Sequence, residues 1–184
     1  MASTVYYAAM SLDGYIAEPE EKLEWLTGFD GPAYEGDDAE PIRESYPRFF
    51  ERIGSLVMGS KTYEFVLDLD TWPYGAMPTW VYTRRDLPRV GAAEGLRFTS
   101  GDVSELHAEI LAAAGGKGLW VIGGGDLASQ YVDAGLLDRV ELTVVPVILG
   151  AGLPLFAGPV PPMKLLGTRP FDSGMVELKY ELVR

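Results

Sequence analysis

The sequence predicts a single α/β domain that spans residues 1–184. The first observation is that short runs of β-branched and aromatic residues alternate with segments of helical spacing, which is typical of a sheet flanked by helices. The second is that the chain after residue 139 contains strand patterns only. A length of 184 residues is enough to bury one substantial core, and no repeat or linker divides it. We therefore expect an α/β sheet that is closed by a β-rich carboxyl end.

Three strands are expected in the first half of the chain. Residues 5–10 form the first, which ends before Asp13-Gly14, a pair that favours a turn. Residues 56–58 form a short buried strand, and residues 79–83 form a third that stops at a charged run. A helix is expected after the second strand, with Ser60 as its N-cap because a serine hydroxyl can accept a bond from the first N–H groups of a helix.

The second half carries two helices and the remaining strands. Asp102 at an N-cap position and Glu105 three residues later indicate a capped helix over residues 103–114, which ends at Gly115-Gly116. A strand over residues 119–122 leads into a triple glycine, and a second helix over residues 126–134 ends at Gly135. The later strands cover residues 140–147, 163–169 and 174–183, the last two paired as a hairpin around 172–174.

Residues 18–44 differ from the rest of the chain in charge, because they hold ten acidic and two basic residues. Glycine and proline recur in this segment and disfavour regular structure. Its apolar residues form one small patch: Leu23, Trp25, Leu26 and Phe29. We therefore expect a long acidic surface loop that a single apolar cluster pins to the domain.

Composition excludes several classes of function. The chain has no cysteine and one histidine, so it cannot supply a Cys/His zinc cluster, a disulfide or a cysteine nucleophile, and we expect no metal. A formal net charge of −12 leaves little positive charge for a phosphate backbone, so neither nucleic acid nor an anionic membrane surface is an expected partner. The single histidine, His107, is expected to be a solvated residue on the polar side of its helix.

The sequence predicts a cytoplasmic protein. Its amino-terminal residues lack the basic region of a signal peptide. The longest uncharged stretch, residues 142–163, contains five prolines, which a membrane helix does not tolerate. The absence of cysteine suits a reducing compartment.

Three turns at strand ends can bind anions. The glycine-rich turn at 123–127 lies between a strand and a helix, so backbone N–H groups can face an anion, although a triple glycine can equally serve a tight turn. The turn at 59–62 offers a second helix amino terminus with a lysine and two hydroxyls. A basic pair follows Thr83, and its simpler interpretation is two solvated arginines. Together the three turns suit a ligand with a pyrophosphate and a further phosphate, and NADPH is such a ligand.

Five segments, in order along the chain, form a recognisable set. They are residues 10–17 (MSLDGYIA), 57–64 (VMGSKTYE), 81–85 (VYTRR), 120–125 (WVIGGG) and 142–152 (LTVVPVILGAG). This set resembles the dihydrofolate reductase-like family, and most closely its branch that includes the C-terminal reductase domain of the riboflavin-biosynthesis deaminase-reductase. The resemblance implies a three-layer fold with a central, mixed, mostly parallel sheet, flanking helices and a C-terminal β-hairpin.

The resemblance also implies where NADPH would bind. The nicotinamide would be flanked by Ala9, Met10 and Ile16. One side of the phosphates would be held by Gly59, Ser60, Lys61 and Thr62, and the other by Gly123, Gly124, Gly125, Asp126 and Leu127. The 2′-phosphate would be held by Thr83, Arg84 and Arg85.

The same comparison implies a substrate side made of Trp25, Tyr46, Phe50, Tyr63 and Thr143. The sequence departs from folate reductases at one position, because they carry a carboxylate on the helix before the Met-Gly motif. The matching residues 45–50 (SYPRFF) contain no acid. This departure argues against dihydrofolate as the substrate, although Glu44 or Asp13 can stand in for that carboxylate.

A proton donor completes the expected site. Asp13 is the nearest catalytic candidate by motif, and its simpler role is to shape the Asp-Gly turn. Tyr46 and Tyr63 are alternatives that the sequence does not rank. The tryptophans at 72, 80 and 120 are expected to be core or cavity wall.

The sequence thus predicts an NADPH-dependent reductase that transfers a hydride to a small pterin- or pyrimidine-like heterocycle. A strongly anionic phosphoribosyl substrate is disfavoured by the acidic segment. A homodimer is expected through the carboxyl-terminal region, whose uncharged residues 144–156 are long for a monomer surface. One alternative is a non-catalytic nucleotide-binding protein of the same fold. Another is a purely structural domain, in which the three turns would be coincidental.

Overall fold

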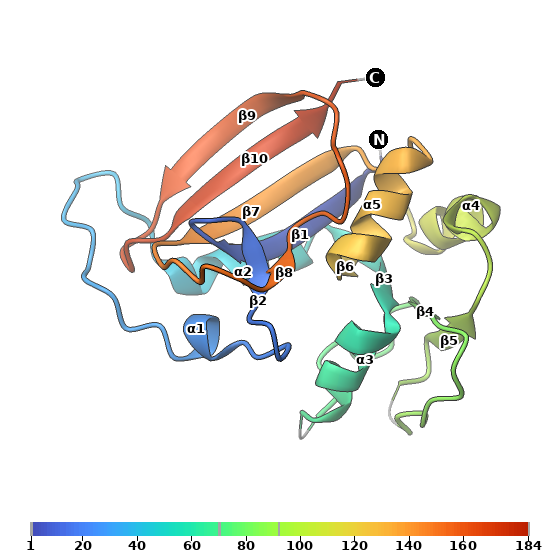
Figure 1. The fold of residues 1–184 in the computed structure, drawn as a ribbon. Coiled ribbons are helices and arrows are strands. Elements are labelled where there is room, and N and C mark those ends of the chain that lie inside the picture. Colours follow the sequence, from blue (N-terminus) through green and yellow to red (C-terminus); the bar gives the residue numbers. More distant parts are fainter. Residues whose placement is uncertain (1, 70, 92, 184) are drawn as a thin grey trace.

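The computed structural model describes residues 2–69, 71–91 and 93–183 and places an eight-stranded sheet between helices (Figure 1). The strand order is β5-β4-β3-β6-β1-β7-β10-β9. The strands are β1 (Thr4–Ser11), β3 (Ile53–Gly59), β4 (Thr79–Tyr82), β5 (Leu96–Thr99), β6 (Gly118–Gly123), β7 (Arg139–Val145), β9 (Met163–Pro170) and β10 (Val176–Leu182), while β2 (Tyr15–Ala17) and β8 (Leu153–Pro154) form a separate pair. The helices are α1 (Glu24–Thr27), α2 (Ser45–Phe50), α3 (Ser60–Leu67), α4 (Val103–Ala113) and α5 (Gly125–Asp133), with a short 3-10 turn, η1 (Ile42–Glu44).

Side chains that alternate along each strand point to opposite faces of the sheet, and each face has its own core cluster. In β3, Val57 packs into one core cluster, whereas Leu56 and Met58 pack into the other. The first cluster includes residues of α4 and α5, such as Ile110, and the second includes residues of α2 and α3, such as Tyr63. The sheet is therefore the middle of three layers.

Strand direction decides where a ligand can bind. The strands from β5 to β7 pair in parallel, with β1 between β6 and β7, whereas β10 runs antiparallel to both β7 and β9. The carboxyl ends of the parallel strands therefore meet at one edge, where α3 and α5 begin. Crevices at this edge are the usual ligand sites of open α/β sheets.

The structure confirms the expected α/β class and the dihydrofolate reductase-like layering. It extends the strands predicted at 5–10, 56–58, 119–122 and 163–169, and it shortens those predicted at 79–83, 140–147 and 174–183. It adds elements with weak local signals, namely β2, β5, β8, α1 and α2. One capping prediction is wrong: Gly59 is the N-cap of α3 and Ser60 is its first helical residue. Asp102 does cap α4, because its carboxylate accepts the Ser104 N–H at 2.8 Å.

The acidic segment is pinned as expected. Residues 28–40 loop away from the sheet at the left of Figure 1 and contain no helix among the described elements. Trp25 is 9% exposed and packs in a third cluster with Val145, Phe171 and Met175. The Trp25 side chain thus packs the acidic segment against the carboxyl end of β7 and against the β9–β10 turn.

The packing of β3 against α4 gives a stability prediction. An ideal Cβ on Gly54 would lie 2.1 Å from the Ala114 carbonyl oxygen, which is backbone and cannot step aside. We expect Gly54→Ala to lower the free energy of unfolding by about 2 kcal/mol, as overpacking typically does. Urea unfolding checks this, with Gly158→Ala as control because no atom lies within 4 Å of its ideal Cβ. Equal effects of the two substitutions would contradict the close approach.

Candidate functional site

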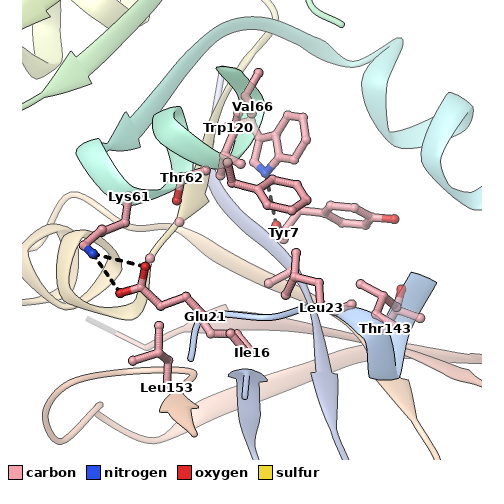
Figure 2. A pocket seen from close by; sticks show the side chains of 18 of the residues that line it. Tyr7, Ile16, Glu21, Leu23, Lys61, Thr62, Val66, Trp120, Thr143 and Leu153 are labelled. Atoms are coloured by element: carbon pink, nitrogen blue, oxygen red, sulfur yellow. Dashed lines mark hydrogen bonds and ion pairs between the residues drawn. The ribbon is translucent and has the colours of Figure 1, made fainter. Parts of the chain in front are cut away.

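A cavity of about 830 Å³ opens at the carboxyl edge of the sheet, and Figure 2 shows it from close by. Its volume falls within the range of about 300–1,000 Å³ that small-molecule sites occupy. It is lined by residues of β1, β2, β6, α2, α3 and the segment after β2. Lys61 and Glu21 lie at one end of the view and Thr143 at the other, so the cavity has two chemically different ends.

The turn between β6 and α5 is built for close backbone approach. Gly123 has φ +145°, a conformation that favours glycine. An ideal Cβ on Gly125 would lie 2.5 Å from the Pro154 carbonyl oxygen, so α5 can reach β8 only with glycine there. Gly123 and Gly124 line the cavity, and α5 has no side-chain cap on its first N–H groups. This turn can therefore present backbone donors to an anion.

The amino terminus of α3 lies beside this turn. An ideal Cβ on Gly59 would be 3.8 Å from the Gly123 carbonyl oxygen, and one on Gly123 would be 3.6 Å from the Thr62 hydroxyl. Lys61 and Thr62 line the cavity, whereas Gly59 and Ser60 lie behind them. The two helix amino termini thus share one space that side chains at either glycine would narrow.

The positive charge of Lys61 is already paired. Its Nζ lies 3.0 and 3.1 Å from the two carboxylate oxygens of Glu21, which comes from the acidic segment (Figure 2). Glu21 is held in a left-handed conformation with φ +62°. A phosphate oxygen would accept from the ammonium in the same way as this carboxylate does.

The arginine pair lies in a second, smaller hollow after β4. This hollow is lined by Thr83, Arg84, Arg85, Asp86, Phe98, Thr99 and Ser100. Arg85 donates two bonds to Glu64, at 2.7 and 2.8 Å, and the guanidinium holds the pKa of that carboxyl below its usual range. No ion pair of Arg84 is found among the described residues. The two arginines are therefore not equivalent.

The far end of the cavity is aromatic and hydroxylic. Its aromatic lining is Tyr7, Tyr46, Tyr74 and Trp120. Tyr46 and Thr143 were predicted there, and Trp120 is a wall as expected, but sequence reasoning missed Tyr7 and Ser45. The Tyr7 hydroxyl lies 3.4 Å from Ser45 Oγ. Only the pairing of β1 with β7 and the packing of α2 on β1 bring these hydroxyls together.

Several predicted residues support the cavity without lining it. Trp25 and Leu127 are buried in core clusters, and Phe50 stacks on Tyr46 with ring centroids 5.5 Å apart. Tyr63 is buried, does not line the cavity, and donates its hydroxyl hydrogen to the Pro88 carbonyl at 2.7 Å. Among the nicotinamide residues, Ala9 and Ile16 line the cavity and Met10 does not, and the Met10 side chain packs against the first core cluster. Gly125 and Asp126 lie in the first turn of α5, behind the cavity wall.

Asp13 shapes a turn and does not line the cavity. Its carboxylate accepts from the Ser11 hydroxyl at 2.7 Å and from the amides of Leu149 and Gly150 at 3.1 and 2.7 Å. The Ser11 bond, followed by these amides, lowers the pKa of Asp13, which is the wrong direction for a proton donor near neutral pH. Glu44 is also engaged elsewhere, because it pairs with Arg48.

His107 differs from the solvated residue that was expected. Its Nε2 lies 2.8 Å from Thr4 Oγ1, and its ring is edge-on to Tyr131 at 6.0 Å. Thr4 begins β1, so this contact lies at the edge of the sheet opposite the cavity. The imidazole therefore takes no part in the site.

Two further findings concern metals and membranes. Within the described ranges, no group of three or more His, Cys, Asp or Glu side chains is arranged to hold a metal ion. In the same part of the chain, no helix has the length and apolar character needed to cross a membrane.

Comparisons with known proteins agree with this geometry. The model of the RibD C-terminal domain matches residues 60–177. The Bacillus subtilis (strain 168) protein YwjB, itself uncharacterized, is 32% identical over 180 residues, which cover 96% of each chain. A candidate riboflavin biosynthesis protein from Shewanella sp. PV-4 superposes with a TM-score of 0.79 at 26% identity, with 99% of each chain covered. A dihydrofolate reductase from Enterococcus faecalis, complexed with NADP(H) and RAB-propyl, has the same fold, with a TM-score of 0.61 at 17% identity and 97% and 95% coverage.

The Asp13 contacts predict that the turn at Leu149 and Gly150 opens more often when the carboxylate is removed. Asp13→Ala removes the acceptor of the Leu149 and Gly150 amides, so we expect both amides to exchange hydrogen faster, with Asp126→Ala as an exposed control. The same contacts make the stability depend on pH, because they lower the pKa of Asp13 in the folded protein. The stabilisation by the Asp13 carboxylate is complete above its unfolded pKa of about 3.9, and it is lost as pH falls through the folded pKa. Unchanged exchange in Asp13→Ala would show that the tether is dispensable.

Proposed function

The chain belongs to the RibD C-terminal domain family, and from this membership and the cavity we propose that it is an NADPH-dependent reductase of a small pterin- or pyrimidine-like heterocycle. The observation that carries the proposal is that one cavity is lined both by the glycine turn at Gly123-Gly124 and by the aromatic end at Tyr46 and Thr143. Hydride transfer requires that cofactor and acceptor share one water-poor space in contact with each other.

The residues present fit a dinucleotide. The helix amino termini after β3 and β6 lie side by side, have no side-chain caps, and border the cavity through Lys61, Thr62, Gly123 and Gly124, which suits a diphosphate. Lys61 and Thr62 would hold the phosphates from the side of α3, and Ala9 and Ile16 would flank the nicotinamide. When bound, the nicotinamide supplies the hydride. The NADP(H) complex of the dihydrofolate reductase with this fold supports the same choice.

The 2′-phosphate is assigned to the hollow after β4. Thr83, Arg84 and Arg85 line it, and Thr99 and Ser100 add hydroxyls from the neighbouring strand end. Arg84 supplies the charge directly, whereas Arg85 would share its guanidinium with Glu64. This hollow is what would distinguish NADPH from NADH.

The chain's own part in the reaction is to orient the acceptor and to exclude water. Leu23, Leu26 and Leu153 line the cavity from the segment after β2, from α1 and from β8, and their apolar side chains disfavour water there. Asp13 is not the proton donor in this proposal, because its carboxylate is bonded to Ser11 and to the turn amides. A phenol such as that of Tyr46 is in place to hold a proton.

A non-catalytic nucleotide-binding protein is the second candidate. It is favoured by one observation, the absence of a carboxylate from residues 45–50, where folate reductases carry one. NADPH oxidation with a panel of pterins, pyrimidines and quinones separates the two. Binding of NADPH without turnover of any acceptor favours the second candidate, and absence of NADPH binding contradicts both.

The phosphate assignment predicts a cofactor preference. We expect wild-type protein to bind NADPH at least about tenfold tighter than NADH, since a charge-assisted bond contributes about 1.5–3 kcal/mol. Arg84→Ala should remove most of that preference by weakening NADPH alone. Tryptophan fluorescence or calorimetric titration measures both ligands, with Arg43→Ala, an exposed arginine of η1, as the control. Equal loss of NADPH and NADH in Arg84→Ala would contradict the assignment.

A homodimer through the carboxyl-terminal region is part of the proposal. β9 is an edge strand whose Leu165 and Leu166 are 52% and 43% exposed, and Ile148, within the uncharged residues 144–156, is 67% exposed. Exposed edge strands with apolar side chains favour pairing with another chain. Light scattering should therefore give twice the chain mass of 20.1 kDa, and Leu165→Lys should give the single mass. A wild-type monomer would overturn this part.

A further inference from the structure

One face of α3 follows the cavity from end to end. Lys61 and Thr62 line the cavity at the amino terminus of the helix, and Phe65 and Val66 line it one turn later. Leu69, two residues after the helix, also lines it, and its N–H donates to the Val66 carbonyl at 3.2 Å. Residues three or four apart lie on the same face of a helix. This face is therefore polar at the anion-binding end of the cavity and apolar at its other end.

The apolar end of this face is open to solvent. Phe65 and Leu69 are 43% and 44% exposed, although both line the cavity. Val66, between them in sequence, is buried and packs in the second core cluster. Exposed apolar side chains at the edge of a cavity mark a place where an apolar ligand group can be covered. We call Phe65 and Leu69 the apolar rim.

The apolar rim is continuous with the aromatic end of the cavity. Val66, Tyr74 and Trp120 all line the cavity and belong to one core cluster. The Tyr74 ring is edge-on to Trp120 with centroids 6.0 Å apart, and the Tyr46 ring approaches Trp120 at 5.9 Å. Figure 2 shows Val66 and Trp120 on one side of the cavity and Leu23 across from them. A ring held at Tyr46 and Trp120 can therefore extend a substituent along Val66 to the rim.

The charges along this route are negative. Within the described ranges, Lys61 is the only basic residue that lines the cavity, and it is paired with Glu21 at the anion-binding end. Glu64, next to Phe65 in sequence, is held by Arg85. Asp68, next to Leu69, is exposed and lines the cavity, and the described part of the chain gives it no ion pair. A phosphate at the rim would therefore meet the Asp68 carboxylate, which repels it.

We infer that the apolar rim binds an uncharged, apolar substituent of the acceptor, such as a benzyl group, and that the acceptor carries no phosphorylated substituent. The substituent covers Phe65 and Leu69 and removes their exposed surface from water, which is favourable. The Asp68 carboxylate disfavours an anion at the same place. The inference rests on the proposed function, since it assigns the class of substituent on the acceptor, and it makes Phe65, Leu69 and Asp68 specificity-determining residues.

Three pyrimidines that share one ring test the rim. They are 4-(methylamino)pyrimidine, 4-(benzylamino)pyrimidine and 4-(2-phosphoethylamino)pyrimidine, which differ only in the substituent. In calorimetric titrations, wild-type protein should bind the benzyl probe at least about tenfold tighter than the methyl probe, because burial of the phenyl ring adds apolar contact area. The phosphate probe should bind no tighter than the methyl probe. Titrations with and without excess NADP⁺ are compared, since bound NADP⁺ keeps the phosphate probe out of the anion-binding end.

Substitutions at the rim test the apolar contact. Phe65→Ala and Leu69→Ala should each weaken the benzyl probe about fivefold and leave the methyl probe unchanged, because each removes apolar area that only the benzyl group covers. Leu12→Ala is the matched control, since Leu12 is 61% exposed and does not line the cavity. It should leave all three affinities unchanged. Circular dichroism confirms that each variant is folded.

A charge reversal tests the exclusion of phosphate. Asp68→Lys should strengthen the phosphate probe about fivefold at low salt, and added salt should reduce the gain, because charges at an exposed site are screened. The methyl probe should be unaffected. Asp133→Lys is the control of equal charge change, since Asp133 is an exposed residue of α5 that does not line the cavity.

The outcomes separate the rim from the reductase proposal. Equal affinity for the benzyl and methyl probes, binding of none of the three, tighter binding of the phosphate probe with NADP⁺ present, or an unchanged benzyl affinity in both Phe65→Ala and Leu69→Ala would overturn the rim. NADPH titration of the same samples is independent, since Phe65, Leu69 and Asp68 are not assigned to the cofactor. Tight NADPH binding with no benzyl preference leaves the reductase intact, and failure of NADPH binding with a clear benzyl preference does the reverse.

Discussion

The parallel pairing of β1 with both β6 and β7 is the constraint on which the rest of the structure depends. It sets Ala9 opposite Thr143 in register. On its other side β6 pairs in parallel with β3, so the carboxyl ends of β3, β6, β1 and β7 lie along one edge. Two helices then begin at one edge, and their first N–H groups have no side-chain caps. Glycine at 125 follows from this crowding, because an ideal Cβ there would strike the Pro154 carbonyl oxygen of β8, and glycine at 123 follows from its φ of +145°. The binding edge is thus a consequence of strand order.

Electrostatics divides that edge into two parts. In a chain of net charge −12, the cations at the anion-binding end are held by carboxylates, Lys61 by Glu21 and Arg85 by Glu64. These exposed pairs contribute little stability of their own, so an incoming phosphate can replace the carboxylate at small cost. The pairs around Glu141 are different, because its carboxylate is buried and must keep its partners. One set of ion pairs is exchangeable and the other is structural.

The sequence predicted the parts of the molecule that have local signals. The glycine turns, the capped helix after Asp102 and the main strands were visible because turn chemistry and alternation are encoded in neighbouring residues. Residues such as Tyr7 and Ser45 were missed because their neighbours come from distant segments, and β8, with two residues, offers no period to detect. Trp25 and Tyr63 were assigned to the substrate because aromatic type alone does not distinguish a core residue from a cavity wall. The role of Asp13 as a turn residue could not be decided from sequence, because two of its hydrogen-bond partners, the amides of Leu149 and Gly150, lie 136 and 137 residues away.

The two ends of the cavity impose different requirements on what they bind. At the glycine turns, backbone N–H groups and ammonium favour an anion, and the geometry is set by glycine and helix direction. At the aromatic end, residues 45–50 on α2 contain no acid, and the nearby Glu141 and Glu177 are buried and paired with cations. A reduced ring would then take its proton from a neutral donor or from water, because no buried carboxyl stands ready to supply one among the cavity residues of the aromatic end. The aromatic end of the cavity therefore offers hydroxyls and phenols as its polar groups, whereas the opposite end offers an ammonium and backbone amides.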